Sequence, residues 1–149
     1  MPEKPIQRPA AVVVLAFDFG LRHIGVAVGQ SLTGSARGAG TLAARQGKPN
    51  WRDVDEVIAQ YRPHQLLVGH PLNMDNSRND ITEAATRFAA RLAAHSGLPT
   101  ELHDERLTTR MAKSALAEAK AMGQAKTDHE LAACLILQSW LNERANPRA

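Results

Sequence analysis

One acidic residue, Asp18, stands where a carboxylate is most costly to place. It ends the most apolar segment of the chain, residues 11–18, which reads Ala-Val-Val-Val-Leu-Ala-Phe-Asp. A carboxylate is expensive to remove from water unless it has a partner, and a metal ion is a common partner. An acid at a solvated strand end, hydrogen-bonded to the following turn, is the alternative. The residue type alone leaves both interpretations open.

A second group of candidate residues lies where a predicted strand meets a predicted helix. Residues 104–109 read Asp-Glu-Arg-Leu-Thr-Thr, so that two acids and an arginine stand together. Sites in open α/β sheets gather at the carboxyl ends of strands, which favours a functional role for Glu105 and Arg106. The two threonines are explained as helix caps, and a solvated turn is the alternative for the acids.

The loop that follows the fourth predicted strand is a third candidate. Residues 68–75 read Val-Gly-His-Pro-Leu-Asn-Met-Asp, and we expect His70, Asn73 and Asp75 to project over the same sheet edge. Such a loop is common, so its chemical specificity is low. The six histidines and Cys134 show no spacing typical of a zinc site, and Cys134 is expected to be a small core residue.

Composition and charge restrict the class of protein. With 44% hydrophobic and 22% charged residues, the 149-residue chain is typical of one globular domain, expected at 11–145 after a flexible tail at 1–10. No apolar run reaches the roughly 18 residues that cross a bilayer, and the tail lacks the apolar core of a secretory signal. With a single cysteine, a cytoplasmic location is expected. The net charge of +3 allows a phosphate-rich partner without requiring one.

The hydrophobic pattern predicts an α/β fold with a mixed sheet and helices on both of its faces. The order of elements is β-β-β-α-β-α-β-α-α. Strands are expected at 11–18, 24–28, 39–43, 65–69 and 100–103, and helices at 51–61, from 77 to a stop at 97, at 108–122, and from 127.

The last predicted helix has a distinct start signal and an apolar face. Thr127 and Glu130 form a Thr-x-x-Glu capping box. Its inner face is expected to carry Leu131, Cys134, Leu135, Gln138 and Leu141.

Four segments, taken together and in this order, resemble the YqgF/RuvX family of pre-16S rRNA nucleases, relatives of the Holliday junction resolvase RuvC. They are Phe-Asp-Phe-Gly at 17–20 with Ile-Gly-Val-Ala-Val at 24–28, the loop at 68–75, the Asp-Glu-Arg-Leu-Thr-Thr at 104–109, and Leu-Ala-Ala-Cys-Leu-Ile-Leu-Gln at 131–138. The resemblance covers roughly residues 13–143. It implies an RNase H-like fold with a mixed five-stranded sheet.

The same resemblance implies a catalytic trio of Asp18, Glu105 and an aspartate that opens the last helix. The family's aspartate stands two residues before Leu-Ala-Ala, a position held here by His129, and Asp128 lies one residue earlier. One residue turns a helix by about 100°, so the third ligand is either Asp128 or His129. The preference of hard cations for oxygen favours Asp128. An acid at the first helical position also complements the helix dipole, which is the structural alternative.

The resemblance implies a metal-dependent endonuclease that acts on the 16S rRNA precursor, on branched DNA, or on both. Three acids at one sheet edge repel one another unless cations lie between them, so two Mg²⁺ or Mn²⁺ ions about 4 Å apart are expected. Whether two copies of the chain associate is left open. Residues expected to hold the nucleic acid are Arg22, Asn73, Arg106, Lys113 and Lys126.

Two other classes of protein are compatible with parts of this pattern. A non-catalytic RNase H-like module could bind nucleic acid with the same fold, although the presence of Asp18, Glu105 and a third acid argues against it. An actin-like ATPase also has a first strand that ends in Asp-x-Gly. Such ATPases need two domains of this kind, and this sequence holds one.

Overall fold

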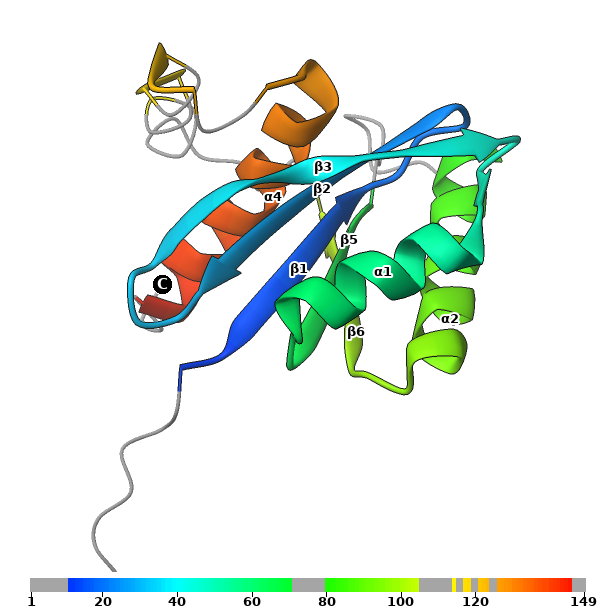
Figure 1. Cartoon of the computed structure of the whole chain (residues 1–149), viewed down its shortest axis with the longest axis horizontal. Helices are drawn as coiled ribbons and strands as arrows, with labels where there is room; N and C mark the ends of the chain where they lie inside the picture. Colours follow the sequence, from blue (N-terminus) through cyan, green and yellow to red (C-terminus); the bar gives the residue numbers. More distant parts are fainter. Residues whose placement is uncertain are drawn as a thin grey trace, which may run out of the picture.

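A mixed sheet of six strands carries the candidate residues. The computed structural model describes residues 11–70, 80–104, 114, 117–118, 121–123 and 126–145. The strand order is β4-β3-β2-β1-β5-β6 (Figure 1). The pairs β1–β2, β2–β3 and β3–β4 are antiparallel, and the pairs β1–β5 and β5–β6 are parallel. Their bounds are β1 Val13–Asp18, β2 His23–Gln30, β3 Ser35–Arg45, β4 Lys48–Pro49, β5 Gln65–His70 and β6 Thr100–Asp104.

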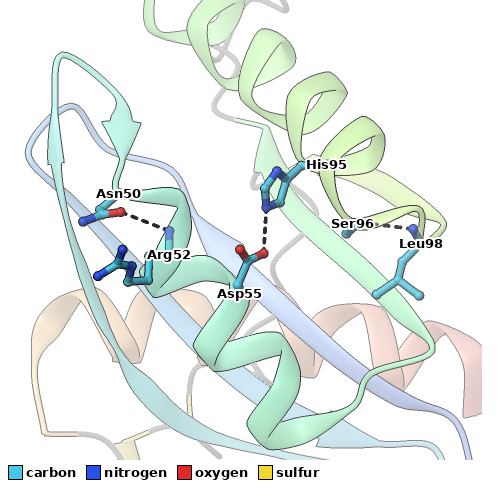
Figure 2. A network of polar contacts seen from close by, with 6 residues as sticks. All are labelled: Asn50, Arg52, Asp55, His95, Ser96 and Leu98. Atoms are coloured by element: carbon cyan, nitrogen blue, oxygen red, sulfur yellow. Dashed lines mark hydrogen bonds and ion pairs between the residues drawn. The ribbon is translucent and has the colours of Figure 1, made fainter.

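The helices cover both faces of the sheet. Helices α1 (Trp51–Tyr61) and α2 (Asp80–Ser96) lie on one face and α4 (Asp128–Ala145) lies on the other (Figure 1). The Asp55 Oδ1 and His95 Nε2 atoms, 2.7 Å apart, join α1 to α2 (Figure 2). None of the helices in the described ranges is long and apolar enough to span a bilayer.

The start and the end of α1 follow local rules. The Asn50 side chain accepts a hydrogen bond from the backbone N–H of Arg52, also drawn in Figure 2. Because this cap satisfies one of the donors left open at the helix start, it favours initiation there. The helix ends at Tyr61, where Arg62 takes a left-handed conformation with a φ of 47° before Pro63. The predicted helix at 51–61 is therefore confirmed.

The two faces of the sheet differ in side-chain size. Side chains alternate between faces along each strand, so each strand supplies both. Large residues face α1 and α2, among them Leu15, Phe17, Ile24, Val26, Leu66 and Val68. Small residues face α4, among them Ala16, Gly25, Ala27, Gly29 and Ala36. This difference lets α4 lie much closer to the strand backbone than bulky side chains would allow.

The closest approach of α4 to the sheet is at Gly25. A Cβ atom built on Gly25 would lie 1.9 Å from the backbone oxygen of His129 and 2.3 Å from its carbonyl carbon. Real Cβ atoms do not approach backbone so closely, so only glycine is compatible with this packing. The first turn of α4 therefore rests directly on the backbone of β2.

The predicted α/β class, with a mixed sheet and helices on both faces, is confirmed, but the strands differ in two ways. The sheet has a sixth strand, β4, whose two residues are too few for an apolar pattern. The third strand runs over Ser35–Arg45 rather than only 39–43. Gly38 and Gly40 interrupt its alternation, and pairing with β2 extends it. Three predictions lie outside the described residues: the tail at 1–10, the helix start at Ser77 and most of the helix at 108–122.

The buried surface of α4 is wider than the predicted stripe. Cys134 and Leu141 are buried as expected, whereas Leu131, Leu135 and Gln138 are only half-buried. Several residues outside the predicted stripe are buried as well, namely Ala133, Ile136, Leu137 and Trp140. The reason is tertiary, because α4 packs on β1, β2 and β3 and also contacts β6, where the Trp140 indole N–H donates to the Glu101 carboxylate.

The Gly25→Ala variant tests the close approach. Because the added methyl group must push α4 off β2, the free energy of unfolding should fall by about 3 kcal/mol. Gly97→Ala is the matched control, because Gly97 has a φ of 72° and its Cβ would meet nothing within 4 Å. Only backbone strain of about 1 kcal/mol is expected there. Urea denaturation measures both, and equal losses would contradict the packing argument.

Candidate functional site

A row of three residues across the sheet defines the candidate site. Asp18 at the end of β1 pairs with Gly25 of β2, and Gly25 pairs with Thr41 of β3. Paired residues on neighbouring strands point to the same face of a sheet. Since a Cβ on Gly25 would point at α4, Asp18 and Thr41 share that face. Val14 and Ala16 also pack toward α4, and Asp18 continues their alternation.

Helix α4 begins on this row. Besides the contact at Gly25, the Thr41 and Thr127 side-chain hydroxyl oxygens lie 3.1 Å apart and share a hydrogen bond. The half-buried carboxylate of Asp18 therefore lies on the sheet row where the helix starts. The free N–H groups of a helix N-terminus carry partial positive charge, which favours carboxylates in their vicinity.

The predicted cap at the start of α4 is confirmed for Thr127, whereas the Glu130 side chain bonds the backbone of the residue before the one expected in a capping box. The Glu130 backbone N–H donates to the Thr127 hydroxyl oxygen at 3.0 Å, and Glu130 Oε1 accepts from the Lys126 backbone N–H at 3.3 Å. Glu130 is buried, with 6% of its surface exposed. Asp128 occupies the first helical position and is exposed. The cap therefore sets the helix register, and with it the placement of Asp128 and His129 on the first turn.

Two imidazole rings stack beside the row. The His23 and His129 ring centroids lie 4.7 Å apart, and the ring planes differ by 20°. His23 opens β2 and precedes Gly25 by two residues, so it belongs to the same face of the sheet. Thus His129 contacts the sheet twice, through its carbonyl at Gly25 and through its ring at His23.

Three strands bring further polar residues to the same sheet edge. β1, β5 and β6 are parallel neighbours and end at Asp18, His70 and Asp104, with His70 and Asp104 paired. Their carboxyl ends therefore share one edge, as predicted for this class of sheet. Glu105 follows Asp104 in the chain. The residues of the candidate set that lie outside the described part are Glu105, Asn73, Asp75, Arg106 and Lys113.

Two of the predicted basic residues lie within the described part, and both are exposed. Arg22 lies in the turn from β1 to β2, where its backbone oxygen accepts from the Ala44 N–H at 2.8 Å. Lys126 immediately precedes the Thr127 cap. Within the described ranges no three His, Cys, Asp or Glu side chains form a group that could hold a metal ion, and Glu105 lies outside those ranges.

Sequence reasoning missed three residues of this arrangement as members of a site. Gly25 does have a signal, because Gly25, Ala27 and Gly29 alternate with branched residues and indicate one small-residue face. Thr41 and His23 have none, since a threonine and a histidine in a strand are ordinary surface residues. Only the fold shows that they contact α4.

Cys134 is a core residue, as predicted. Its exposed fraction is 1%. Burial raises the pKa of its thiol to about 12, with a smaller contribution from the negative charge of Glu130. At neutral pH the group is a protonated thiol, which is a poor nucleophile. Cys134 therefore takes no part in the candidate chemistry.

Comparison with known proteins decides the family. The family model for RuvX, described as Holliday junction resolvase, matches residues 12–143. The chain belongs to the RuvX family. Curated relatives from Glaesserella parasuis and Azotobacter vinelandii are 50% and 46% identical over 135 and 134 residues. The alignments cover 89% of this chain in both cases and 97% and 94% of the relatives. Both carry the name "Putative pre-16S rRNA nuclease", so RuvX is a nuclease family.

Solved structures agree with the RuvX assignment at the level of the fold. Thermus thermophilus RuvC, solved with a Holliday junction substrate, aligns with a TM-score of 0.60 at 18% identity, covering 91% of this chain and 96% of that one. The yeast mitochondrial Holliday junction resolvase Ydc2 aligns with a TM-score of 0.52 at 12% identity, covering 89% and 78%. The predicted RNase H-like fold is therefore confirmed.

The raised pKa of Cys134 predicts a pH-dependent contribution to stability. The folded thiol stays protonated up to about pH 12, whereas the unfolded thiol ionises near its ordinary pKa of 9.0. Folding therefore takes up a proton in this window, and stability falls as the pH rises through it, by at most about 1.4 kcal/mol per pH unit. Urea denaturation between pH 9 and 11 should show a shallower decline for Cys134→Ala than for the wild type. Parallel pH profiles would contradict the assignment.

Proposed function

We propose that this RuvX-family chain is a metal-dependent endonuclease whose site lies where β1, β5 and β6 end beside the start of α4. The observation that carries the proposal is the row Asp18–Gly25–Thr41, on which α4 begins. It supports a site in which a carboxylate on a central strand meets residues from the first turn of the last helix. The end of β1 and the first turn of α4 are two of the three segments that supply the proposed metal ligands, and the third is the segment that holds Glu105.

The proposed metal ligands are Asp18, Glu105 and Asp128, with His129 as the alternative to Asp128. Carboxylate oxygens are the donors that Mg²⁺ and Mn²⁺ prefer, so the donor set fits these ions. Two such ions, when bound, would supply an activated water and stabilise the leaving 3′ oxygen. The half-buried Asp18 ends β1, a central strand that lies between β2 and β5, whereas Asp128 is exposed at the helix start. This difference suits Asp18 to be the ligand that both ions would share.

The geometry at the start of α4 bears on the choice of the third ligand. The ring of His129 already has one face stacked on His23. Asp128 is an exposed carboxylate at the first helical position, next to partial positive charge. Hard cations prefer its oxygen atoms to an imidazole nitrogen, so we assign the third ligand to Asp128.

The proposed substrate contacts are phosphate contacts. Arg22 and Lys126 are exposed, one in the turn that follows Asp18 and one immediately before the cap of α4. Cations at these places would hold the backbone on either side of the cleaved bond. We include Asn73, Arg106 and Lys113 in the same role on sequence grounds.

We propose the 16S rRNA precursor as the physiological substrate, in the cytoplasm. The names of relatives that align over nearly their whole length favour it over branched DNA. A junction resolvase also needs two symmetric sites and hence a dimer, whereas a single cut in RNA does not. Purified protein with Mg²⁺ or Mn²⁺ should cut a precursor RNA carrying the 5′ leader faster than a four-way DNA junction. The reverse preference would overturn the substrate assignment.

Asp18→Asn should abolish cleavage without unfolding the chain. The amide preserves the volume of the side chain but removes the negative charge that would hold a cation, and a loss of at least about 100-fold in rate is expected. Glu105→Gln should have the same effect. Cleavage of the precursor RNA under saturating Mg²⁺ measures the loss, and circular dichroism verifies the fold.

Glu56→Gln is the control, because Glu56 is an exposed acid of α1 away from the site edge. It should retain wild-type cleavage.

Millimolar Mn²⁺ should also raise the melting temperature of the wild type more than that of Asp18→Asn, since a ligand that binds only the folded state stabilises it. Full cleavage by Asp18→Asn would refute the role of Asp18 as a metal ligand, whereas no cleavage by the wild type with either ion would leave a non-catalytic nucleic-acid-binding module.

Asp128→Asn and His129→Ala separate the two candidates for the third ligand. If Asp128 binds the cation, Asp128→Asn should lower the rate by about 100-fold or more, and His129→Ala should lower it much less. Single-turnover cleavage rates at saturating Mn²⁺ and Mg²⁺ measure the ranking. A reversed ranking would assign the ligand to His129, which should then favour Mn²⁺ over Mg²⁺.

A further inference from the structure

The outer edge of β3 forms a surface of which the proposed function uses only the neighbouring Lys126. β4 pairs only with Ala44 and Arg45, so residues 35–43 of β3 face no other described strand on that side. Figure 1 shows β3 as the long outer strand beyond β2. An open edge of this length commonly marks a place where another chain or ligand docks.

Two hollows lie along this edge and meet at the same two residues. One, of about 500 Å³, is lined by Gln30, Thr33, Ser35 and Gln60 together with Arg37 and Tyr61. The other, of about 490 Å³, is lined by Gly38, Ala39, Gly40, Lys126 and Glu130 together with the same Arg37 and Tyr61. We call the pair the β3-edge groove.

A β-bulge shapes the middle of the β3-edge groove. Val26 pairs with Gly40 and Ala27 pairs with Gly38, so Ala39 has no partner on β2. Gly40 has a φ of 109°, and a Cβ built on it would meet nothing within 4 Å. The strand therefore presents bare backbone to solvent at this point, which allows a ligand to approach closely.

The charges and the aromatic ring of the groove match the parts of a nucleotide. Arg37 and Lys126 are exposed cations, and the one acid among the described lining residues, Glu130, is buried and bonded to the Lys126 backbone. The Arg37 guanidinium carbon lies 5.9 Å from the centroid of the Tyr61 ring. That distance is at the outer limit of a cation–π contact, and a base could stack on the half-buried ring in place of the guanidinium.

From these observations we infer that the β3-edge groove binds an unpaired segment of the nucleic acid that the site cleaves. A base would stack on Tyr61, its edge would meet the amide and hydroxyl groups of the first hollow, and phosphates would lie on Arg37 and Lys126. The inference rests on the proposed nuclease function and names the part of the substrate that the groove holds.

The groove leads toward the proposed site. Lys126 precedes Thr127, whose hydroxyl contacts Thr41 on the row that ends at Asp18. Arg37 and Thr41 are separated by four residues of β3, or about 13 Å, and Thr41 and Asp18 by two strand spacings, or about 10 Å. A single strand of a few nucleotides spans these distances.

Binding without cleavage tests the inference. In a buffer with chelator and no divalent cation, the full chain is titrated against a labelled single-stranded RNA of about 12 nucleotides, followed by fluorescence anisotropy. Arg37→Glu should weaken binding at least about tenfold. The slope of log affinity against log salt concentration should also become shallower by about one, which corresponds to the loss of one phosphate contact. Tyr61→Leu, which keeps an apolar group in the core, should weaken it by about tenfold.

Arg91→Glu is the matched control, because it makes the same charge change at an exposed arginine of α2 that does not line the groove. It should change the affinity less than about twofold. Equal losses for Arg37→Glu and Arg91→Glu would show only a general charge effect and overturn the inference. Unchanged binding by Arg37→Glu would also overturn it, leaving the open edge of β3 to an added peptide strand.

The same variants separate failure of the groove from failure of the proposed function. Arg37-dependent RNA binding in a chain that never cleaves would support the groove and refute the nuclease mechanism. Cleavage that depends on Asp18, together with RNA binding that does not depend on Arg37, would support the nuclease mechanism and refute the groove. Arg37 is exposed, so its variant is expected to fold even if Tyr61→Leu does not.

Discussion

The contact between the first turn of α4 and the bare backbone of Gly25 is the constraint on which the rest of this structure depends. It leaves no room for even one methyl group, so the height of α4 above the sheet is set by backbone atoms and not by adaptable side chains. The Thr41–Thr127 hydrogen bond then fixes α4 along the row. At the other end of the sheet, the Gln138 side chain bonds to the backbone of Gly34 and Ala36 in the β2–β3 hairpin. The helix is thus held at both ends of its path.

The two faces of the sheet differ in a way that allows this close contact. The face toward α1 and α2 carries large, fully buried side chains such as Leu15 and Phe17, each of which stabilises the fold by about 2 kcal/mol. Aromatic contacts add to this core, for example Phe17 edge-on to Phe88 with 6.0 Å between ring centroids. The face toward α4 has smaller side chains, which bury less apolar surface each but let the helix lie closer to the strand backbone. Both faces therefore bury apolar side chains, and the placement of the candidate residues comes from the face toward α4.

Much of this arrangement could be predicted from local sequence patterns, and the rest depends on contacts between distant elements. The apolar run ending at Asp18 and the Thr127–Glu130 capping box are local signals, and the structure confirms the strand and the Thr127 cap. The length of β3 was not predictable, because its glycines interrupt the pattern and pairing with β2 supplies the order. The buried surface of α4 differs from the predicted stripe for the same reason, since Trp140 packs toward β6 and bonds Glu101 there. The stacking of His23 on His129 likewise has no local signal.

The anchoring of α4 also orders events in folding. The bonds from Gln138 to the hairpin join residues 102 and 104 positions apart, so closing these contacts costs more chain entropy than forming the β1–β2–β3 meander. The meander and its large-residue face can collapse early around α1. Until α4 docks, the small-residue face lies open and the Asp18 row has no helix beside it. In the proposed enzyme the nascent chain would therefore acquire its hydrolytic centre only in the last step, when the C-terminal helix closes over a sheet that is already formed.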